Sequence, residues 1–382
     1  MRLFASCAPG LEPLLEAEIR SLGVPEVAPT PGGVELDGDL ALLYRLNLEL
    51  GLAQQVRLRL ATFTATKFPA LVRAVAGLDF APHLGEGVPV EVRASARKSR
   101  LYHTGAVAER VLEGVSLALG RKLPEPGAPT ELPPVVLHAR FERDVCTLSL
   151  DTSGEPLHRR GYRLESAKAP LREDLARALV VVSGWDRQSL FVDPFVGSGT
   201  LPIEAALLAR GLPPGAGRRF AFMDAPSFDR GLWERLRATA LSASLPRLPF
   251  VIGGSDRDEG AVRAARSNAA RAGVEGDLSL ACAPLGRAPL LLEPPGPRGA
   301  LVTNPPYGQR VGKEATLRSL YQALGRAVRA LPPDYRVALV VADRRLAHAT
   351  GLRLTSALMT DHGGTKVCFM VGSAGGDVGA RP

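Results

Sequence analysis

The chain has 382 residues, of which 46% are hydrophobic and 23% charged, and its formal net charge is +8. This length leaves room for two or three domains of about 100–200 residues each, and the apolar content excludes a disordered chain. The four cysteines are scattered without paired spacing, which disfavours a zinc site or a disulfide framework. No apolar run approaches the roughly 18 residues of a membrane helix. We therefore expect a cytoplasmic monomer without metal or membrane contact.

The positive charge is unevenly distributed along the chain. Residues 1–163 carry 19 basic and 19 acidic side chains, whereas residues 164–382 carry 28 and 20. A basic excess is typical of proteins that bind nucleic acid, although solubility or heat adaptation can produce the same composition. Nucleic acid is therefore one hypothesis for the partner.

The first 62 residues predict a compact α+β unit. Short apolar strands alternate with amphipathic helices, and Asp39 is placed to cap the second helix. The expected elements are strands at 2–7, 34–36 and 55–60, a helix at 11–22, and a helix after Asp39. Because no residue in it carries visible chemistry, we expect this unit to support or orient the domains after it.

A second unit is expected over residues 63–152, with helices at 68–76 and 105–119 and strands at 88–94, 135–140 and 145–151. Residues 93–104, at a strand–helix junction, interleave cations, hydroxyl groups and an aromatic ring. That mixture favours contact with RNA phosphates and sugars, and a solvated loop is the alternative. We expect His103 to be a backbone contact or a helix cap. The expected RNA-binding residues are Arg93, Arg97, Lys98, Arg100, Tyr102 and His103.

Residues 153–170 form the expected linker between the two halves of the chain. Turn-forming residues surround three arginines, Arg159, Arg160 and Arg163. We expect these arginines to line the path of the RNA substrate, and a passive linker is the alternative.

Residues 171–382 alternate strands with helices, which predicts a Rossmann-like α/β domain around a mostly parallel sheet. The expected strands are 189–192, 250–253, 278–281, 300–303, 335–341, 352–358 and 366–371. The expected helices are 171–181, 259–272, 315–331 and one that runs from the loop at 193–200 to residue 209.

The loop Asp193-Pro-Phe-Val-Gly-Ser-Gly-Thr200 comes directly after the first of these strands. Its glycines allow a ligand to approach the backbone, while its hydroxyl groups and the helix N-terminus offer donors to a carboxylate. Asp193 is placed to accept from a ligand amine, and Asp256 from both hydroxyls of a ribose. S-adenosyl-L-methionine carries all three of these groups, a carboxylate, an amine and a ribose, and is therefore the expected ligand. A nicotinamide or ATP site is the alternative. The expected cofactor residues are Asp193, Pro194, Gly197, Ser198, Gly199, Thr200, Asp256, Arg257 and Asn304.

Four consecutive residues after a buried strand, Asn304, Pro305, Pro306 and Tyr307, are the expected catalytic residues. The Asn304 side-chain oxygen and the Pro305 carbonyl can accept both N–H groups of a nucleobase amine, which localises its lone pair on nitrogen. The two prolines restrict the backbone, and the Tyr307 ring offers a stacking face for a base that has left its helix. A strand-ending turn without chemistry is the alternative.

These motifs carry a family resemblance. Residues 151–163, 193–206 and 303–310 resemble the THUMP-containing guanine-N2 RNA methyltransferases. The RlmL type, which modifies large-subunit ribosomal RNA, is closest in pattern. The resemblance implies an N-terminal ferredoxin-like domain, a THUMP domain and a Rossmann-like class I methyltransferase domain that uses S-adenosyl-L-methionine. One departure is visible: many relatives hold the adenine amine with an acidic residue after the third strand, where this chain has Leu280-Ala-Cys-Ala-Pro284.

The resulting expectation is methyl transfer to guanine N2 of RNA, with 23S ribosomal RNA ahead of tRNA. Two other hypotheses remain open at this point. One is a DNA adenine or cytosine amino-methyltransferase, which shares the Asn-Pro-Pro-Tyr motif. The other is a non-catalytic RNA-binding assembly factor, which the missing carboxylate near Cys282 keeps open.

Overall fold

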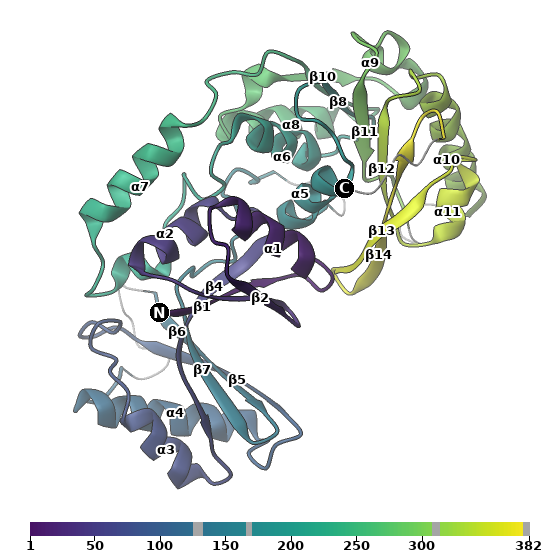
Figure 1. Cartoon of the computed structure of the whole chain (residues 1–382). Helices are drawn as coiled ribbons and strands as arrows, with labels where there is room; N and C mark the ends of the chain where they lie inside the picture. The colour runs from purple at the N-terminus through teal and green to yellow at the C-terminus, as the bar shows by residue number, and fades with distance from the viewer. Residues whose placement is uncertain (125–132, 166–169, 308–313, 377–382) are drawn as a thin grey trace.

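The computed structural model describes residues 1–124, 133–165, 170–307 and 314–376, and it contains two seven-stranded sheets. One sheet belongs to the N-terminal part of the chain and the other to the C-terminal part (Figure 1). The predictions for residues 166–169, 308–313 and the other undescribed stretches lie outside this description. Among the described residues no helix is long and apolar enough to cross a membrane.

The N-terminal sheet has the strand order β2-β3-β1-β4-β7-β6-β5. All of its neighbouring pairs are antiparallel except β5 and β6, which α4 connects in parallel. Its strands are β1 Arg2–Cys7, β2 Val27–Thr30, β3 Gly33–Asp37, β4 Ala53–Thr64, β5 Val90–Arg97, β6 Val135–Glu142 and β7 Val145–Asp151.

Strand β4 joins the two N-terminal units that the sequence predicts as separate domains. Its first half pairs with β1, and from Arg57 to Thr64 it pairs with β7. The boundary predicted between residues 62 and 63 therefore falls inside a strand, and one continuous sheet spans both units. The reason is physical: the 12 residues of β4 are long enough to pair with one unit on each edge.

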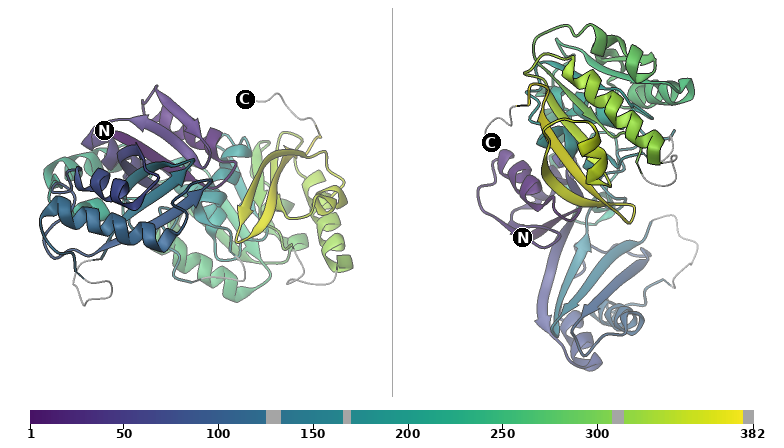
Figure 2. Two further views of the ribbon diagram at one scale, coloured as in Figure 1. Left: turned by 90° about the horizontal axis from the view of Figure 1, so that it is seen from below. Right: turned by 90° about the vertical axis from the view of Figure 1, so that its right-hand side faces the viewer.

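Within the described residues four helices accompany the N-terminal sheet: α1 Glu12–Ser21, α2 Leu40–Glu49, α3 Phe68–Ala76 and α4 Thr104–Leu119. The Asp39 side chain accepts from the Leu42 backbone N–H at 2.8 Å, which confirms the predicted cap of α2. Helices α3 and α4 lie at the end of the molecule farthest from the C-terminal sheet (Figure 2). Contact between them is close, because a Cβ on Gly114 would come within 2.7 Å of Val75.

The C-terminal sheet has the order β10-β9-β8-β11-β12-β14-β13. The five strands from β10 to β12 are parallel, whereas β13 and β14 form an antiparallel hairpin, so the predicted mostly parallel Rossmann-like sheet is confirmed. The strands are β8 Leu190–Asp193, β9 Ile252–Asp256, β10 Leu278–Cys282, β11 Gly299–Thr303, β12 Arg336–Val341, β13 Thr355–His362 and β14 Thr365–Ser373.

Three α-helices of the C-terminal part of the chain, α7, α9 and α11, were not predicted. Helix α7 lies in the long segment between α6 and β9. The α-helices are α5 Glu173–Val182, α6 Thr200–Arg210, α7 Arg230–Ser242, α8 Glu259–Arg271, α9 Pro289–Leu292, α10 Glu314–Arg329 and α11 Arg344–Ala349. Three short 3₁₀ helices are η1 Ala221–Asp224, η2 Glu275–Asp277 and η3 Leu285–Arg287.

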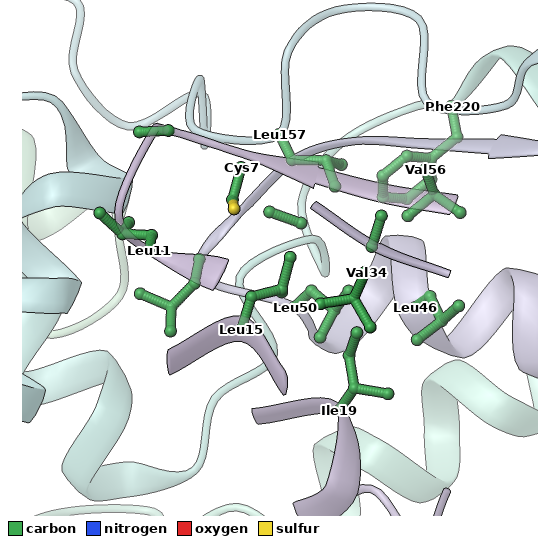
Figure 3. Close-up of a cluster of buried hydrophobic side chains, with 14 of the residues drawn as sticks. Cys7, Leu11, Leu15, Ile19, Val34, Leu46, Leu50, Val56, Leu157 and Phe220 are labelled. Carbon is green, nitrogen blue, oxygen red and sulfur yellow. The ribbon is translucent and has the colours of Figure 1, made fainter. Parts of the chain in front are cut away.

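The segment before α7 and the linker complete the core of the N-terminal unit. Leu157 of the linker and Phe220 lie among apolar side chains of β1, α1 and α2 (Figure 3). Tyr44 of α2 stacks on Phe222 with ring centroids 4.4 Å apart and accepts from the Asp229 backbone N–H at 3.0 Å. Because these buried contacts join distant segments, the N-terminal and C-terminal parts pack as one body.

Candidate active site

Three functional segments converge at the carboxyl ends of neighbouring parallel strands. Strand β8 lies between β9 and β11, so the chain order reverses beside it, which is where open α/β sheets bind ligands. Asp193 ends β8, Asp256 ends β9 and Thr303 ends β11. The strand register thus brings together residues that are up to 110 positions apart in the sequence.

Asp193 ties the first of these strand ends to the third. Its Oδ1 accepts from the Thr303 hydroxyl at 2.5 Å and from the Phe195 backbone N–H at 3.0 Å, and no described residue bonds its Oδ2. The side chain is 1% exposed. Burial raises the pKa of Asp193 to about 7, although both hydrogen bonds act in the opposite direction. Asp193 therefore changes its charge near neutral pH, with one oxygen left for a ligand.

The glycine loop bends tightly between β8 and α6. Gly199 has φ +87 and a Cβ there would lie 3.0 Å from the Ala265 Cβ, so both backbone and packing require glycine. The Gly197 backbone N–H donates to Asp256 Oδ2 at 3.1 Å, which links the loop to β9. The Ser198 hydroxyl is buried and has no hydrogen-bond partner among the described residues. A buried polar group without a partner indicates a place for a ligand atom or a water.

Asn304 presents an unpaired acceptor directly after β11. Its Oδ1 is buried and has no partner within the described part of the chain. Leaving such an atom unpaired costs about 1–3 kcal/mol, so the site is built to receive a donor. Pro305 is buried and Pro306 half-buried, which holds the adjoining backbone in place.

Tyr307 is half-buried and packs against both large hydrophobic clusters. Its hydroxyl lies 3.2 Å from Nδ1 of His362 at the end of β13. Burial raises the pKa of Tyr307 to about 12, so the phenol keeps its proton at neutral pH. The remaining exposed part of the ring is available to a planar partner.

At the end of the third strand, β10, the structure offers backbone groups instead of a carboxylate. The Ala283 N–H donates to the Asp256 carbonyl at 2.8 Å, and the exposed Cys282 thiol lies 3.8 Å from the Arg257 carbonyl. Arg257 is exposed beside them. The acidic residue that many relatives have after the third strand is thus also missing from this strand end in the structure.

The sequence profile described as the RMKL-like methyltransferase domain matches residues 160–364. The chain belongs to the RMKL-like methyltransferase family. A second profile, the RlmL ferredoxin-like domain, matches residues 2–57. These matches confirm the RlmL-type resemblance drawn from the motifs and place a ferredoxin-like domain at the N-terminus of this methyltransferase.

Relatives and a solved structure agree with this assignment. The ribosomal RNA large subunit methyltransferase K/L of Syntrophotalea carbinolica is 37% identical over 362 residues, covering 92% of this chain and 51% of that protein. The chain thus spans about half the length of that relative. The Synechocystis protein slr0064 is 33% identical over 363 residues, with 94% of each chain covered. The structure of SMU.472 complexed with SAH has a TM-score of 0.86 and 27% identity, covering 97% of both chains.

In this RMKL-like methyltransferase the predicted RNA-binding junction is accessible. Its six predicted side chains, Arg93, Arg97, Lys98, Arg100, Tyr102 and His103, are all accessible to solvent. The ring centroids of Tyr102 and His103 lie 4.2 Å apart. His103 occupies the N-cap position of α4, and its side chain makes no capping hydrogen bond. An exposed aromatic pair beside cations is compatible with stacking on bases, which stays a prediction.

The predicted RNA contact of Arg160 is wrong. Its side chain is 2% exposed and lies 3.4 Å from Glu204 of α6, and it also donates to the carbonyls of Leu157 and Gly51. A buried guanidinium requires such a carboxylate partner, and a sequence does not reveal that partner 44 residues away.

The other two linker arginines differ from Arg160 and from each other. Arg163 is 17% exposed and donates to Glu173 at 3.1 Å and to the Leu171 carbonyl at 2.9 Å. Its donors are thus engaged within the protein, which does not support the predicted RNA contact. Arg159 is 66% exposed and pairs with Glu155, so its RNA contact stays a prediction. The packed linker is not a passive connection.

Two residues near the site were not predicted as functional. Thr303 was expected only as the end of a strand, yet its hydroxyl bonds Asp193. His362 was not singled out, yet its ring meets Tyr307. The strand end at Thr303 was a usable signal for the first, whereas only the sheet pairing brings His362 to the site.

Proposed function

We propose that this chain transfers the methyl group of S-adenosyl-L-methionine to the 2-amino group of guanine in RNA, with 23S ribosomal RNA as substrate. The observation that carries this proposal is the buried Oδ1 of Asn304, which directly follows β11 and has no hydrogen-bond partner among the residues that the structure describes. An acceptor held in that position satisfies an amine hydrogen and raises the electron density on its nitrogen.

The cofactor is S-adenosyl-L-methionine, and the residues of the loop fit it. The N-terminus of α6 and the Ser198 hydroxyl, which no described residue pairs, suit its carboxylate, and the Oδ2 of Asp193 suits its ammonium group. Asp256 accepts two backbone N–H groups, one on each oxygen, and a carboxylate keeps further lone pairs for ribose hydroxyls. When bound, the cofactor supplies an electrophilic methyl group. SMU.472, a structural neighbour, was solved with SAH.

The chain itself holds and orients the target base. Asn304 Oδ1 and the Pro305 carbonyl accept the two amine hydrogens, and the Tyr307 ring stacks on the extruded base. Burial around Asn304 excludes water and strengthens these hydrogen bonds. Alignment and electrostatic stabilisation carry the reaction, and the amine proton leaves to solvent after transfer without a strong general base.

The RNA part of the proposal rests on two supports. One is the similarity to the Syntrophotalea relative, a ribosomal RNA large subunit methyltransferase. The other is the exposed basic and aromatic junction at residues 93–104, which we assign to a THUMP domain spanning residues 63–152. We place the catalytic domain at residues 171–382 and the ferredoxin-like domain at 1–62, with residues 153–170 between the two halves.

The decisive experiment measures methyl transfer from labelled S-adenosyl-L-methionine into RNA from cells that lack this protein. Large ribosomal, small ribosomal and transfer RNA are fractionated, and the labelled nucleoside is identified. We expect N2-methylguanosine in the large ribosomal fraction. Label in tRNA alone would show that tRNA is the substrate, and the absence of N2-methylguanosine from every fraction would overturn the proposal.

Asn304→Ala tests whether the Asn304 Oδ1 acts as the hydrogen-bond acceptor of the target amine. Losing the acceptor should lower turnover at least about a hundredfold, while the cofactor dissociation constant changes less than about threefold. The contrasting variant is Asn268→Ala, because Asn268 donates to the Ser198 carbonyl at 2.9 Å and supports the cofactor loop. It should weaken cofactor binding more than turnover at saturation. Loss of cofactor binding in Asn304→Ala would remove the assigned role.

A further inference from the structure

The Tyr307 hydroxyl has one defined partner in a distant part of the chain. It lies 3.2 Å from Nδ1 of His362, 55 residues away, at the end of β13. Apolar side chains of both hydrophobic clusters pack on the Tyr307 ring. The ring is thus held by packing on its sides and by one polar contact at its tip, while part of it stays exposed.

The protonation states of the two rings indicate the direction of this hydrogen bond. Burial lowers the pKa of His362, so the imidazole is neutral and carries one N–H. Burial keeps the Tyr307 phenol protonated. We assign the phenol as donor and Nδ1 as acceptor, which places the imidazole proton on Nε2.

His362 is itself fixed by the hairpin and by the N-terminal unit. It pairs with Thr365 across a tight turn in which Gly363 and Gly364 have φ +60 and φ +81. The hairpin runs from the C-terminal sheet toward the N-terminal unit (Figure 1), where Gly10 lies so close that a Cβ on it would clash with the Met359 carbonyl. A side chain carried by a tight hairpin that is packed in this way can hold another side chain in one orientation.

We infer that His362 is a positioning residue, which holds the Tyr307 ring through its hydroxyl in the orientation that receives the target base. The inference rests on the proposed function, because it gives Tyr307 the role of the stacking surface. Without the hydrogen bond the ring samples more orientations, and part of its stacking free energy is spent on ordering it. The base then spends less time aligned for reaction, although the rest of the RNA still binds.

The kinetic test is a double-mutant cycle of His362→Leu and Tyr307→Phe. Each variant should lower turnover about fivefold, the usual effect of one neutral hydrogen bond, with the KM for RNA within about twofold. The double variant should be no slower than either single variant, because both remove the same bond. His362→Asn should recover most of the rate, since its Oδ1 replaces Nδ1 as acceptor. His348→Leu, at an exposed histidine of α11, is the matched control and should leave turnover unchanged.

Two results of this cycle would overturn the inference. One is a double variant whose loss equals the product of the single losses, which would mean that the two side chains act independently. The other is a His362→Asn variant as slow as His362→Leu, which would mean that packing of the imidazole matters and its acceptor does not.

A second readout needs no turnover. A short single-stranded RNA containing 2-aminopurine, whose amino group has the same position as that of guanine, is bound in the presence of SAH. Stacking on Tyr307 should quench its fluorescence in the wild type, and His362→Leu and Tyr307→Phe should reduce the quenching equally. An unquenched wild type, or equal quenching in wild type and His362→Leu, contradicts the inference. If the quenching depends on His362 but the protein methylates no RNA, the proposed function is wrong and the positioning role of His362 stands.

Discussion

The arginines of the β5–α4 junction and two of the linker arginines, Arg160 and Arg163, look alike in the sequence but have opposite surroundings. At the junction Arg93 and Arg100 are 53% and 76% exposed, whereas in the linker Arg160 and Arg163 are 2% and 17% exposed. Both groups lie among turn-forming residues and other cations. The difference is the carboxylate that each arginine meets, since Glu204 and Glu173 are buried in helices of the C-terminal domain.

Arg160 belongs to a buried ionic network that connects three parts of the chain. Arg160 and Tyr162 of the linker both contact Glu204, and Arg177 of α5 lies 3.9 Å from Glu204 and 3.4 Å from Glu18 of α1. Removing a charge from water is costly unless a counter-charge is close, so these groups depend on one another. A cluster of arginines thus indicates RNA only where no buried acid faces it.

The largest expected effect is on the network. Arg160→Met removes a positive charge that balances the buried carboxylate of Glu204. It should lower the free energy of unfolding by about 3–5 kcal/mol. The matched control is Arg159→Met, one residue away and exposed, which should change stability by less than about 0.5 kcal/mol. Urea unfolding measures both. Equal effects at the two positions would mean that the buried pair with Glu204 adds nothing to stability.

A pH-dependent effect is expected at Glu173, which pairs with Arg163. Burial raises the pKa of Glu173 from 4.5 to about 7. The folded state therefore binds this proton more tightly, and the stability it contributes is complete below pH 4.5 and lost as the pH rises through about 7. Glu173→Gln stays neutral, so at about pH 8 it should exceed the wild type in stability by about 1–3 kcal/mol.

Urea unfolding of wild type and Glu173→Gln at about pH 5 and about pH 8 checks the sign. The advantage of the variant should shrink toward the lower pH, where the wild-type carboxyl is protonated as well. A difference that does not change with pH would mean that Glu173 stays ionised beside Arg163.

The smallest expected effect on stability is at the junction, where substitutions should lower RNA affinity and leave the free energy of unfolding nearly unchanged. Arg97→Gln combined with Arg100→Gln should weaken RNA affinity about three- to tenfold, and the slope of log K against log salt should fall by roughly 0.7 for each cation removed. Arg110→Gln on α4, exposed and paired with Glu113, is the control. Unchanged affinity in the double variant would exclude the junction from the RNA interface.

Most of the fold and the centre of the site could be predicted because their signals are local. The glycine loop and the Asn-Pro-Pro-Tyr run each come directly after a strand, and parallel strand ends meet at one sheet edge. The roles of Arg160 and His362 could not be predicted, because Glu204 and Tyr307 reach them only through helix packing and strand pairing. Helix α7 was missed although its sequence carries a usable signal: Leu232, Leu236 and Ala240 recur at helical spacing beside the buried Trp233.

The continuity of β4 has a consequence for shortened forms of this protein. A fragment that ends at residue 62 would keep the pairing of β4 with β1 but lose β7, its partner from Arg57 onward. The freed backbone N–H and C=O groups would form an open sheet edge, which invites pairing between chains. Aggregation is therefore the expected fate of the isolated ferredoxin-like fragment, and the shortest soluble N-terminal piece must extend through β7.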